Sequence, residues 1–182
     1  MFAAAVATLT QCVDALADID PAGLGIAEQL GLLDVLETTR RRLTAVSHTV
    51  ALAAAKSDAP TVMAKAIADA IRVSPAEVRR RLRDAEQLAP RSTLTGEPLP
   101  ALMPSTALGW HAGDLDGEHV RVIQKFLRDL PTDIAPNVVA DSEAFLASYA
   151  QQLRPDQLDK LAVQLAMRVN PDGRFSDEDR AR

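Results

Sequence analysis

Few residues of this sequence could perform chemistry, and most of them gather in one segment. The stretch HAGDLDGEH holds two histidines and three carboxylates within nine residues: His111, Asp114, Asp116, Glu118 and His119. Such side chains ligate zinc or calcium. With Gly117 at the turn of a calcium loop, however, the twelfth position is Ile123 rather than glutamate. His119 also falls at the third position of an expected helix, where a capping role suffices. We predict no metal site and no cofactor.

Other catalytic arrangements are missing from the sequence. Cys12 is the only cysteine, which excludes an internal disulfide and a multi-cysteine zinc site. No glycine-rich phosphate loop, nucleophile elbow or cysteine–histidine pair is present. His48 lies beside the apolar stripe of a long expected helix and is interpreted as packed or solvated. We therefore predict no catalytic residues and expect that the chain is not an enzyme.

The stretch RVSPAEVRRRLRDAEQL (residues 72–88) suggests binding instead of catalysis. The window 72–91 contains six arginines against three acidic residues, a local net charge of +3 in a chain whose net charge is −5. Arginine forms bidentate hydrogen bonds with phosphate, so the exposed face of such a helix could contact a nucleic acid. Five arginines are the candidate nucleic-acid-binding residues: Arg72, Arg79, Arg80, Arg83 and Arg91.

The same arginines are also compatible with a solvated helix face. Arg80 has Glu77 and Asp84 at helical spacing, so surface ion pairs would absorb part of its charge. Arg72 stands where a helix-turn-helix usually has glycine, and Arg81 where it usually has an apolar residue. Polar and aromatic side chains that read bases are absent from the exposed face. A second basic run, residues 40–42, is interpreted as solvated.

The elements that would position these arginines are two helices joined by a tight turn. Ser74, Pro75 and Glu77 form a capping-box pattern at the start of the second helix. Similar helix starts recur at residues 115–120 and 153–158. The residues expected to point inward are Ile67, Ala68, Ile71, Val73 and Val78. This spacing suits a helix-turn-helix motif, which also occurs in helical domains that do not bind DNA.

Apolar periodicity predicts an all-α fold, a bundle of about seven to eight helices with repeated helix–turn–helix connections. The helices are expected at about residues 3–18, 26–55, 61–72, 75–89, 105–113, 117–130, 133–152 and 155–169. The stripe of the second helix includes Leu43, Val46, Val50 and Leu52. Trp110 and Tyr149 are expected in the core.

Four segments are expected along the chain. They are an N-terminal helical lobe (1–89) with a helix-turn-helix-like end, a proline-rich connecting loop (90–104) without regular structure, a C-terminal helical lobe (105–170) and a charged tail (171–182). The lobes are expected to pack as one domain. No stretch is apolar enough to span a membrane, and the N-terminus lacks the cationic start of a signal peptide. We therefore expect no membrane partner and a cytoplasmic location.

Several of these segments together resemble the thirteen-E-twelve repeat family, which is domain-of-unknown-function family number 222. The matching segments, in the family's order, are VSPAEVRRRLRDAEQLAP, GEPLPALMPSTALGWHAGDLDGEHVRVIQKFLRDLP, LRPDQLDKLAVQLA and NPDG, with a fainter LLDVLETTRRRLTAV before them. The likeness extends over nearly the whole chain. Members of the family are typically longer, and many carry a C-terminal HNH endonuclease domain.

This sequence departs from such members because it contains no HNH-like histidine cluster and no CxxC pair. The resemblance therefore implies a helical, non-catalytic N-terminal region, for which double-stranded DNA is the first candidate partner. Two alternatives remain open at this point. The chain could be a protein-interaction scaffold or homo-oligomer, or a truncated family member without independent activity.

Overall fold

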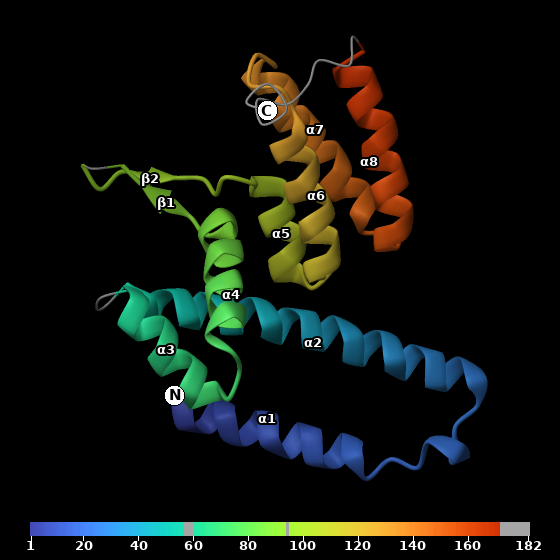
Figure 1. The fold of residues 1–182 in the computed structure, drawn as a ribbon. Coiled ribbons are helices and arrows are strands. Elements are labelled where there is room, and N and C mark those ends of the chain that lie inside the picture. The colour runs from blue at the N-terminus through green and yellow to red at the C-terminus, as the bar shows by residue number, and fades with distance from the viewer. Residues whose placement is uncertain (57–59, 94, 172–182) are drawn as a thin grey trace. The chain divides into compact units, whose positions relative to one another are not determined.

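The computed structural model describes residues 1–56, 60–93 and 95–171. Within them the chain forms eight α-helices: α1 (Phe2–Ala17), α2 (Ile26–Ala55), α3 (Pro60–Ile71), α4 (Pro75–Leu88), α5 (Pro104–Ala112), α6 (Gly117–Asp129), α7 (Pro136–Ala150) and α8 (Pro155–Val169) (Figure 1). A short 3-10 turn, η1 (Pro21–Gly23), precedes α2. The predicted all-α class is confirmed.

Helix boundaries follow local chemistry. Proline occupies the first turn of α4, α5, α7 and α8, where its missing N–H costs nothing because that donor has no partner inside the helix. α7 starts at Pro136 rather than at the expected residue 133 for this reason. The predicted charged tail lies outside the described residues from position 172 onward.

Residues 90–104 are not free of regular structure, and this prediction was wrong. β1 (Arg91–Ser92) and β2 (Pro98–Leu99) form a two-stranded antiparallel hairpin in which Arg91 is opposite Leu99. Glycine at position 96 has a φ of 87°, which other residues rarely adopt. A ladder of two residues per strand needs no alternating apolar pattern, so periodicity could not reveal it.

The chain divides into two compact units, Met1–Glu37 and Thr38–Arg182, and the boundary falls inside α2. The predicted lobes on either side of residues 90–104 stay a prediction. In the first unit, no residue of α1 is buried. The second unit holds the main hydrophobic core.

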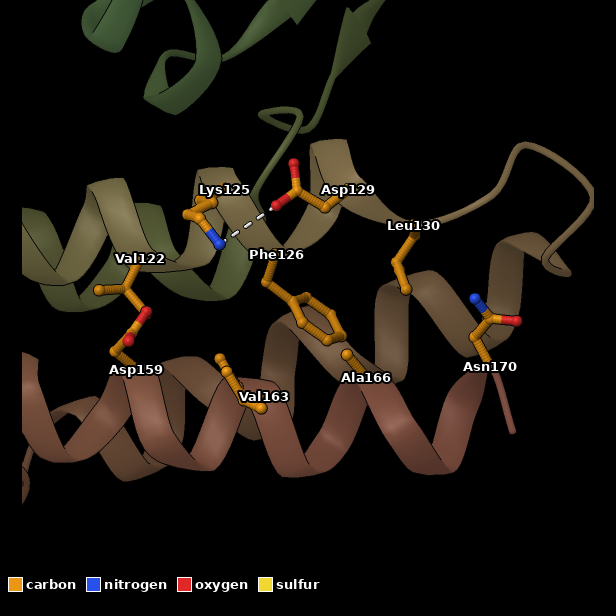
Figure 2. Close-up of a pocket in the computed structure, with 10 residues that line it drawn as sticks. Val122, Lys125, Phe126, Asp129, Leu130, Asp159, Val163, Ala166 and Asn170 are labelled. Atoms are coloured by element: carbon orange, nitrogen blue, oxygen red, sulfur yellow. Dashed lines mark ion pairs between the residues drawn. The ribbon is translucent and has the colours of Figure 1, made fainter. Parts of the chain in front are cut away.

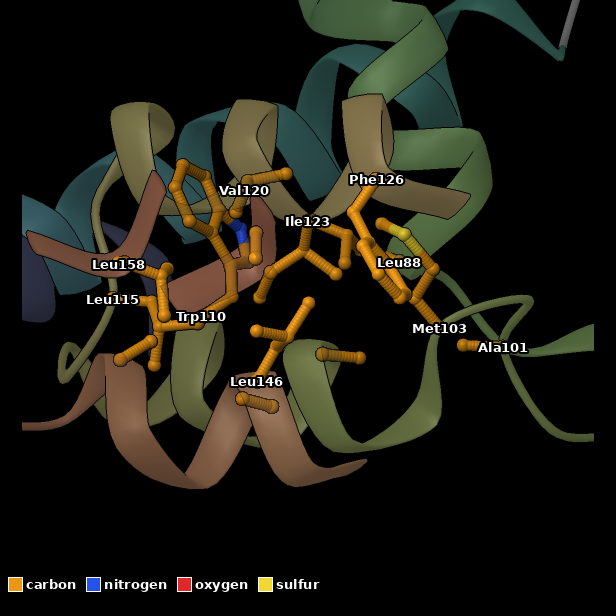
Figure 3. Close-up of a cluster of buried hydrophobic side chains, with 14 of the residues drawn as sticks. Leu88, Ala101, Met103, Trp110, Leu115, Val120, Ile123, Phe126, Leu146 and Leu158 are labelled. Atoms are coloured by element: carbon orange, nitrogen blue, oxygen red, sulfur yellow. The ribbon is translucent and has the colours of Figure 1, made fainter. Parts of the chain in front are cut away.

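That core is formed chiefly by α5, α6, α7 and α8 (Figure 3). Its centre consists of four side chains with no exposed surface: Leu115, Ile123, Leu146 and Leu158. Trp110 lies among them, as predicted, and its ring is 5.4 Å from that of the buried His48 on α2. Tyr149 was predicted in the core as well, but it is 45% exposed. It contacts Phe145 on the outer side of α7, with ring centroids 4.7 Å apart.

The inward face of α2 also differs from the prediction. Ala45, His48 and Leu52 are buried, whereas Leu43, Val46 and Val50 are 42% to 62% exposed. Apolar residues occur on two sides of this helix, and periodicity alone does not tell which side meets the core. Burial of a histidine and an alanine in place of the larger aliphatic residues was therefore not expected.

Candidate nucleic-acid interface

The turn between α3 and α4 has the backbone geometry of a Schellman helix end. The N–H of Val73 donates to the carbonyl of Ala68 over 3.1 Å, and Arg72 between them adopts a φ of 57°. Glycine usually occupies this left-handed position because a side chain strains it. In the sequence, arginine in place of the usual glycine counted against a helix-turn-helix, yet Arg72 adopts the conformation that glycine has in such a turn.

A small apolar cluster holds α3 and α4 together. Its buried members are Ala64, Ala68 and Val78, and Ile67, Val73 and Leu82 pack against them. Four of the five predicted inward residues belong to this cluster. The fifth, Ile71, is 46% exposed, because the chain leaves the helix immediately after it.

The cap at the start of α4 is half of the predicted capping box. The hydroxyl of Ser74 accepts a hydrogen bond from the N–H of Glu77 over 3.1 Å, as predicted. The carboxylate of Glu77 does not return the bond in the part of the chain that the structure describes. It accepts hydrogen bonds from Arg80 and Arg81 instead, with N–O distances between 2.7 and 2.9 Å.

Because of this ion-pair network, Arg80 is not one of the arginines without an ion-pair partner. Arg80 binds Glu77 at i−3 and Asp84 at i+4, the two partners expected from the sequence. The hydrogen bond from Arg80 is the main cause that lowers the pKa of Glu77 to about 2, and the same bond raises the pKa of Arg80. The network stiffens the helix and neutralises part of its charge.

Arg79 and Arg83 remain available. Both are exposed and lie one helical turn apart on α4, so they project from the same face. Within the described residues, neither has an ion pair or a hydrogen bond through its guanidinium group. Arg72 is also exposed and without such a partner there. These three side chains are the exposed arginines of the α3–α4 motif that have no such partner among the described residues.

Arg91 lies after α4 and has a different environment. It is the first residue of β1, and its Nε donates to the carbonyl of Pro100 over 3.0 Å. The bond crosses the hairpin and leaves the remaining guanidinium nitrogens exposed. Arg91 is therefore oriented by the hairpin, whereas Arg79 and Arg83 are oriented by α4.

Other parts of the second unit hold the C-terminal end of α4 in place. Leu88 is buried in the main core (Figure 3), and the amide of Gln124 on α6 donates to Asp84 over 3.1 Å. The N–H of Leu102 donates to the carbonyl of Gln87 over 3.1 Å. Because one face of α4 is anchored in this way, its arginine face is presented from a rigid support.

The basic run at residues 40–42 was interpreted as solvated, which is wrong for its middle residue. Arg41 is half-buried, and its guanidinium donates to the carbonyl of Gly113 over 3.2 Å. Arg41 thus joins α2 to the connection between α5 and α6. Its role in the structure is to hold that connection in place.

The histidine-rich segment serves as a helix cap. Asp116 accepts from the N–H groups of Glu118 and His119, and the Nδ1 of His119 lies 3.1 Å from the Asp116 carboxylate. Burial disfavours the charge of Asp116, but these backbone bonds outweigh it and lower the pKa of the carboxyl group. The second nitrogen of His119 reaches the carbonyl of Leu153 over 2.8 Å. Both imidazole nitrogens are thereby occupied.

In the described part of the chain, no group of three or more histidine, cysteine, aspartate or glutamate side chains is arranged so that it could hold a metal ion. His111 is exposed at the end of α5.

The described residues contain no helix with the length and apolar character needed to cross a membrane.

A groove of about 90 Å³ lies between the C-terminal halves of α6 and α8 (Figure 2). Phe126 and Val163 contribute apolar surface to it, and the ion pair between Lys125 and Asp129 crosses its rim over 3.3 Å. The groove contains no nucleophile paired with a base, so its lining offers no catalytic arrangement.

One buried carboxylate, that of Glu143, could not be predicted from the sequence. Glu143 on α7 is only 3% exposed and accepts hydrogen bonds from the N–H and the hydroxyl of Thr106, both over 2.6 Å. It also accepts from the N–H of Ser105 over 3.3 Å. Glu143 therefore caps α5 from another helix, 37 residues away from Thr106. No local pattern around either residue signals this contact.

Residues 30–182 match a family model described as a domain of unknown function, DUF222. The chain belongs to this family. The match includes α4 and all of its arginines, together with the whole of the main core.

Several relatives of the chain are mycobacterial proteins whose names describe no function. An uncharacterized protein of Mycobacterium tuberculosis strain H37Rv is 40% identical over 183 residues, which cover 98% of this chain and 40% of the relative. An uncharacterized protein of Mycobacterium bovis is 37% identical over 180 residues, or 97% of this chain and 39% of the relative. The DUF222 chain thus spans about two fifths of the length of these relatives. No solved structure matches it.

Proposed function

We propose that the chain is a non-catalytic helical module that contacts the backbone of double-stranded DNA through the arginine face of the α3–α4 motif. The observation that carries this proposal is the arrangement of Arg72, Arg79 and Arg83. All three are exposed on one helix-turn-helix-like motif and have no ion-pair partner among the described residues. Exposed guanidinium groups on a rigid helix can replace the counterions of phosphate groups.

The type of contact follows from the chemistry of this face. Arginine fits phosphate oxygens in a bidentate manner, whereas no asparagine or glutamine accompanies Arg79 and Arg83 on the exposed part of α4. Of the three acidic residues of α4, Glu77 and Asp84 are bound by arginines, which limits their repulsion of phosphate, whereas Glu86 is exposed. We therefore expect binding that depends on salt and depends little on base sequence.

The longer relatives suggest a context for such binding. The chain spans only 40% of the first relatives, and its sequence resembles the N-terminal region of HNH-endonuclease-associated repeat proteins. In that context the helical module would hold DNA for a catalytic domain located elsewhere in a longer chain. This proposal assigns no catalytic residue to the 182 residues considered.

The proposal is tested by measuring the affinity for a fluorescent DNA duplex between about 50 and 200 mM salt. The logarithm of the binding constant should fall with the logarithm of salt by about 0.9 per phosphate contact. The variant Arg79→Gln/Arg83→Gln should reduce this slope by roughly 1.8 if both arginines contact phosphates.

A matched control removes two other exposed arginines, Arg128 on α6 and Arg168 on α8. The variant Arg128→Gln/Arg168→Gln changes the net charge by the same amount and should keep the slope of the unmodified chain. Equal effects of the two double variants would show a non-local effect of charge. An unchanged slope in the first variant would remove α4 from the interface.

A further inference from the structure

Within the first unit, α1 carries an apolar stripe that no other element covers. None of the residues Phe2–Ala17 is buried, although five large apolar side chains follow each other at alternating spacings of four and three positions: Phe2, Val6, Leu9, Val13 and Leu16. They are between 38% and 84% exposed. An isolated helix of 16 residues is marginally stable in water, so this stripe requires a covering surface.

The stripe has the heptad pattern of a coiled coil. Val6 and Val13 occupy the a positions, and Leu9 and Leu16 occupy the d positions. A β-branched residue at the a position with leucine at the d position favours a parallel coiled coil of two helices over higher oligomers. The side chains of α1 thus indicate a specific kind of partner, which is a second helix with the same stripe.

The flanks of the stripe permit pairing with an identical helix. The flanking e and g positions carry no charge: Ala3, Ala5, Thr10, Cys12 and Ala17. Like charges at these positions would repel in a symmetric pair, and none is present despite the net charge of −5. The hydroxyl of Thr10 donates to the carbonyl of Val6 over 3.1 Å within its own helix. Asp14 lies at a b position, away from the seam.

The area of the stripe limits the strength of the pairing. The exposed fractions of the five side chains correspond to roughly 500 Å² of apolar surface per helix, or about 1,000 Å² in a pair, which is the lower limit for a specific interface. A pair of this size dissociates at low concentration. Its dissociation constant should therefore be measurable by dilution.

We propose that α1 binds α1 of a second copy of this chain as a parallel two-stranded coiled coil. This inference gives the alternative of a self-assembling protein a defined surface. It does not rest on the proposed contact between α4 and DNA, and either proposal can fail without the other.

The first test is the dependence of molecular mass on concentration, measured by sedimentation equilibrium. The chain should change from monomer to dimer, and Leu9→Lys/Val13→Lys should weaken dimerisation at least about tenfold. The control Ala7→Lys/Gln11→Lys adds the same charge to the b and f positions of α1 and should still dimerise. The near-ultraviolet circular dichroism of Trp110, the only tryptophan and a core residue, should be unchanged in both variants.

The second test determines the orientation of the helices. In a Cys12→Ser background, Leu9→Cys and Leu16→Cys should each form a disulfide with the same residue of the second copy under a mild oxidant. Parallel d positions bring equivalent Cα atoms within the distance that a disulfide requires. Gln11→Cys, at the outward f position, should remain a thiol.

Three results would overturn the proposal. The first is a monomeric mass at every concentration, and the second is dimerisation that Leu9→Lys/Val13→Lys leaves unchanged. The third is cross-linking at only one of positions 9 and 16, since an antiparallel pair can bring at most one of them to its equivalent. A chain that stays monomeric but binds phosphatidylcholine vesicles through α1 would assign the stripe to a lipid surface instead.

Discussion

Replacement of Glu143 by alanine should lower the free energy of unfolding more than most alanine substitutions at the surface do. Glu143 supplies the acceptor for three donors at the start of α5, and Met103 at the N-cap position makes no side-chain bond of its own. Thr106 has no exposed surface, so water cannot replace the lost acceptor. Its hydroxyl and N–H would remain buried without partners.

The magnitude follows from these contacts. Loss of a helix cap costs about 1 kcal/mol, and an unsatisfied buried hydroxyl adds about 1–3 kcal/mol. We therefore expect Glu143→Ala to lower the free energy of unfolding by about 3 kcal/mol. Glu143→Gln retains one carboxamide oxygen as an acceptor and should cost less than the alanine variant. Thr106→Val removes the hydroxyl alone and should cost about 1 kcal/mol.

Urea unfolding followed by circular dichroism measures these free energies. The double variant Glu143→Ala/Thr106→Val should be more stable than the sum of the single effects predicts, because the valine no longer presents an unpaired hydroxyl. Strict additivity would show that Glu143 and Thr106 do not interact energetically. A cost below about 1 kcal/mol for Glu143→Ala would contradict the assignment of Glu143 as the cap of α5.

Three further substitutions test local features of the second unit. Arg72→Gly should raise the free energy of unfolding by about 0.5–1 kcal/mol, measured by urea titration, because glycine adopts the positive φ of 57° without strain. Gly113→Ala should lower it by about 2 kcal/mol in the same assay, since φ is 87° there and an added Cβ would lie 2.8 Å from the Thr38 carbonyl oxygen. Burial, followed by the charge of Arg81, lowers the pKa of His48 below its usual 6.5. Its contribution to stability is therefore complete above about pH 6.5 and is lost as the pH falls below that value, and His48→Gln should flatten this decline in thermal unfolding between about pH 7 and 5.

Local patterns in the sequence predict the helices of this fold well. Pro75 and Pro155 start α4 and α8 as expected, because proline fixes φ near the helical value and lacks an N–H that the first turn cannot use. The ion pairs of Arg80 follow equally from spacing along one helix. Such features depend only on residues three or four positions apart.

Features that depend on distant residues could not be predicted in this way. The exposure of Leu43 and Tyr149 is decided by which face of each helix meets the core. The contact of Glu143 with Thr106 joins two helices. At the candidate interface, sequence spacing suggested the motif, but it predicted neither the left-handed conformation of Arg72 nor that Arg79 and Arg83 lack an ion pair within the described residues while Arg81 binds Glu77.

The contact of the α4 arginine face with DNA is tested most directly by the nuclear magnetic resonance signals of the arginine side chains. The Nε–H signals of Arg72, Arg79 and Arg83 should shift as a short DNA duplex is added, and the shifts should diminish at high salt. The signals of Arg128 and Arg168, which are exposed on other helices, should remain in place. Absence of shifts in Arg72, Arg79 and Arg83, or equal shifts in all five arginines, would contradict the account.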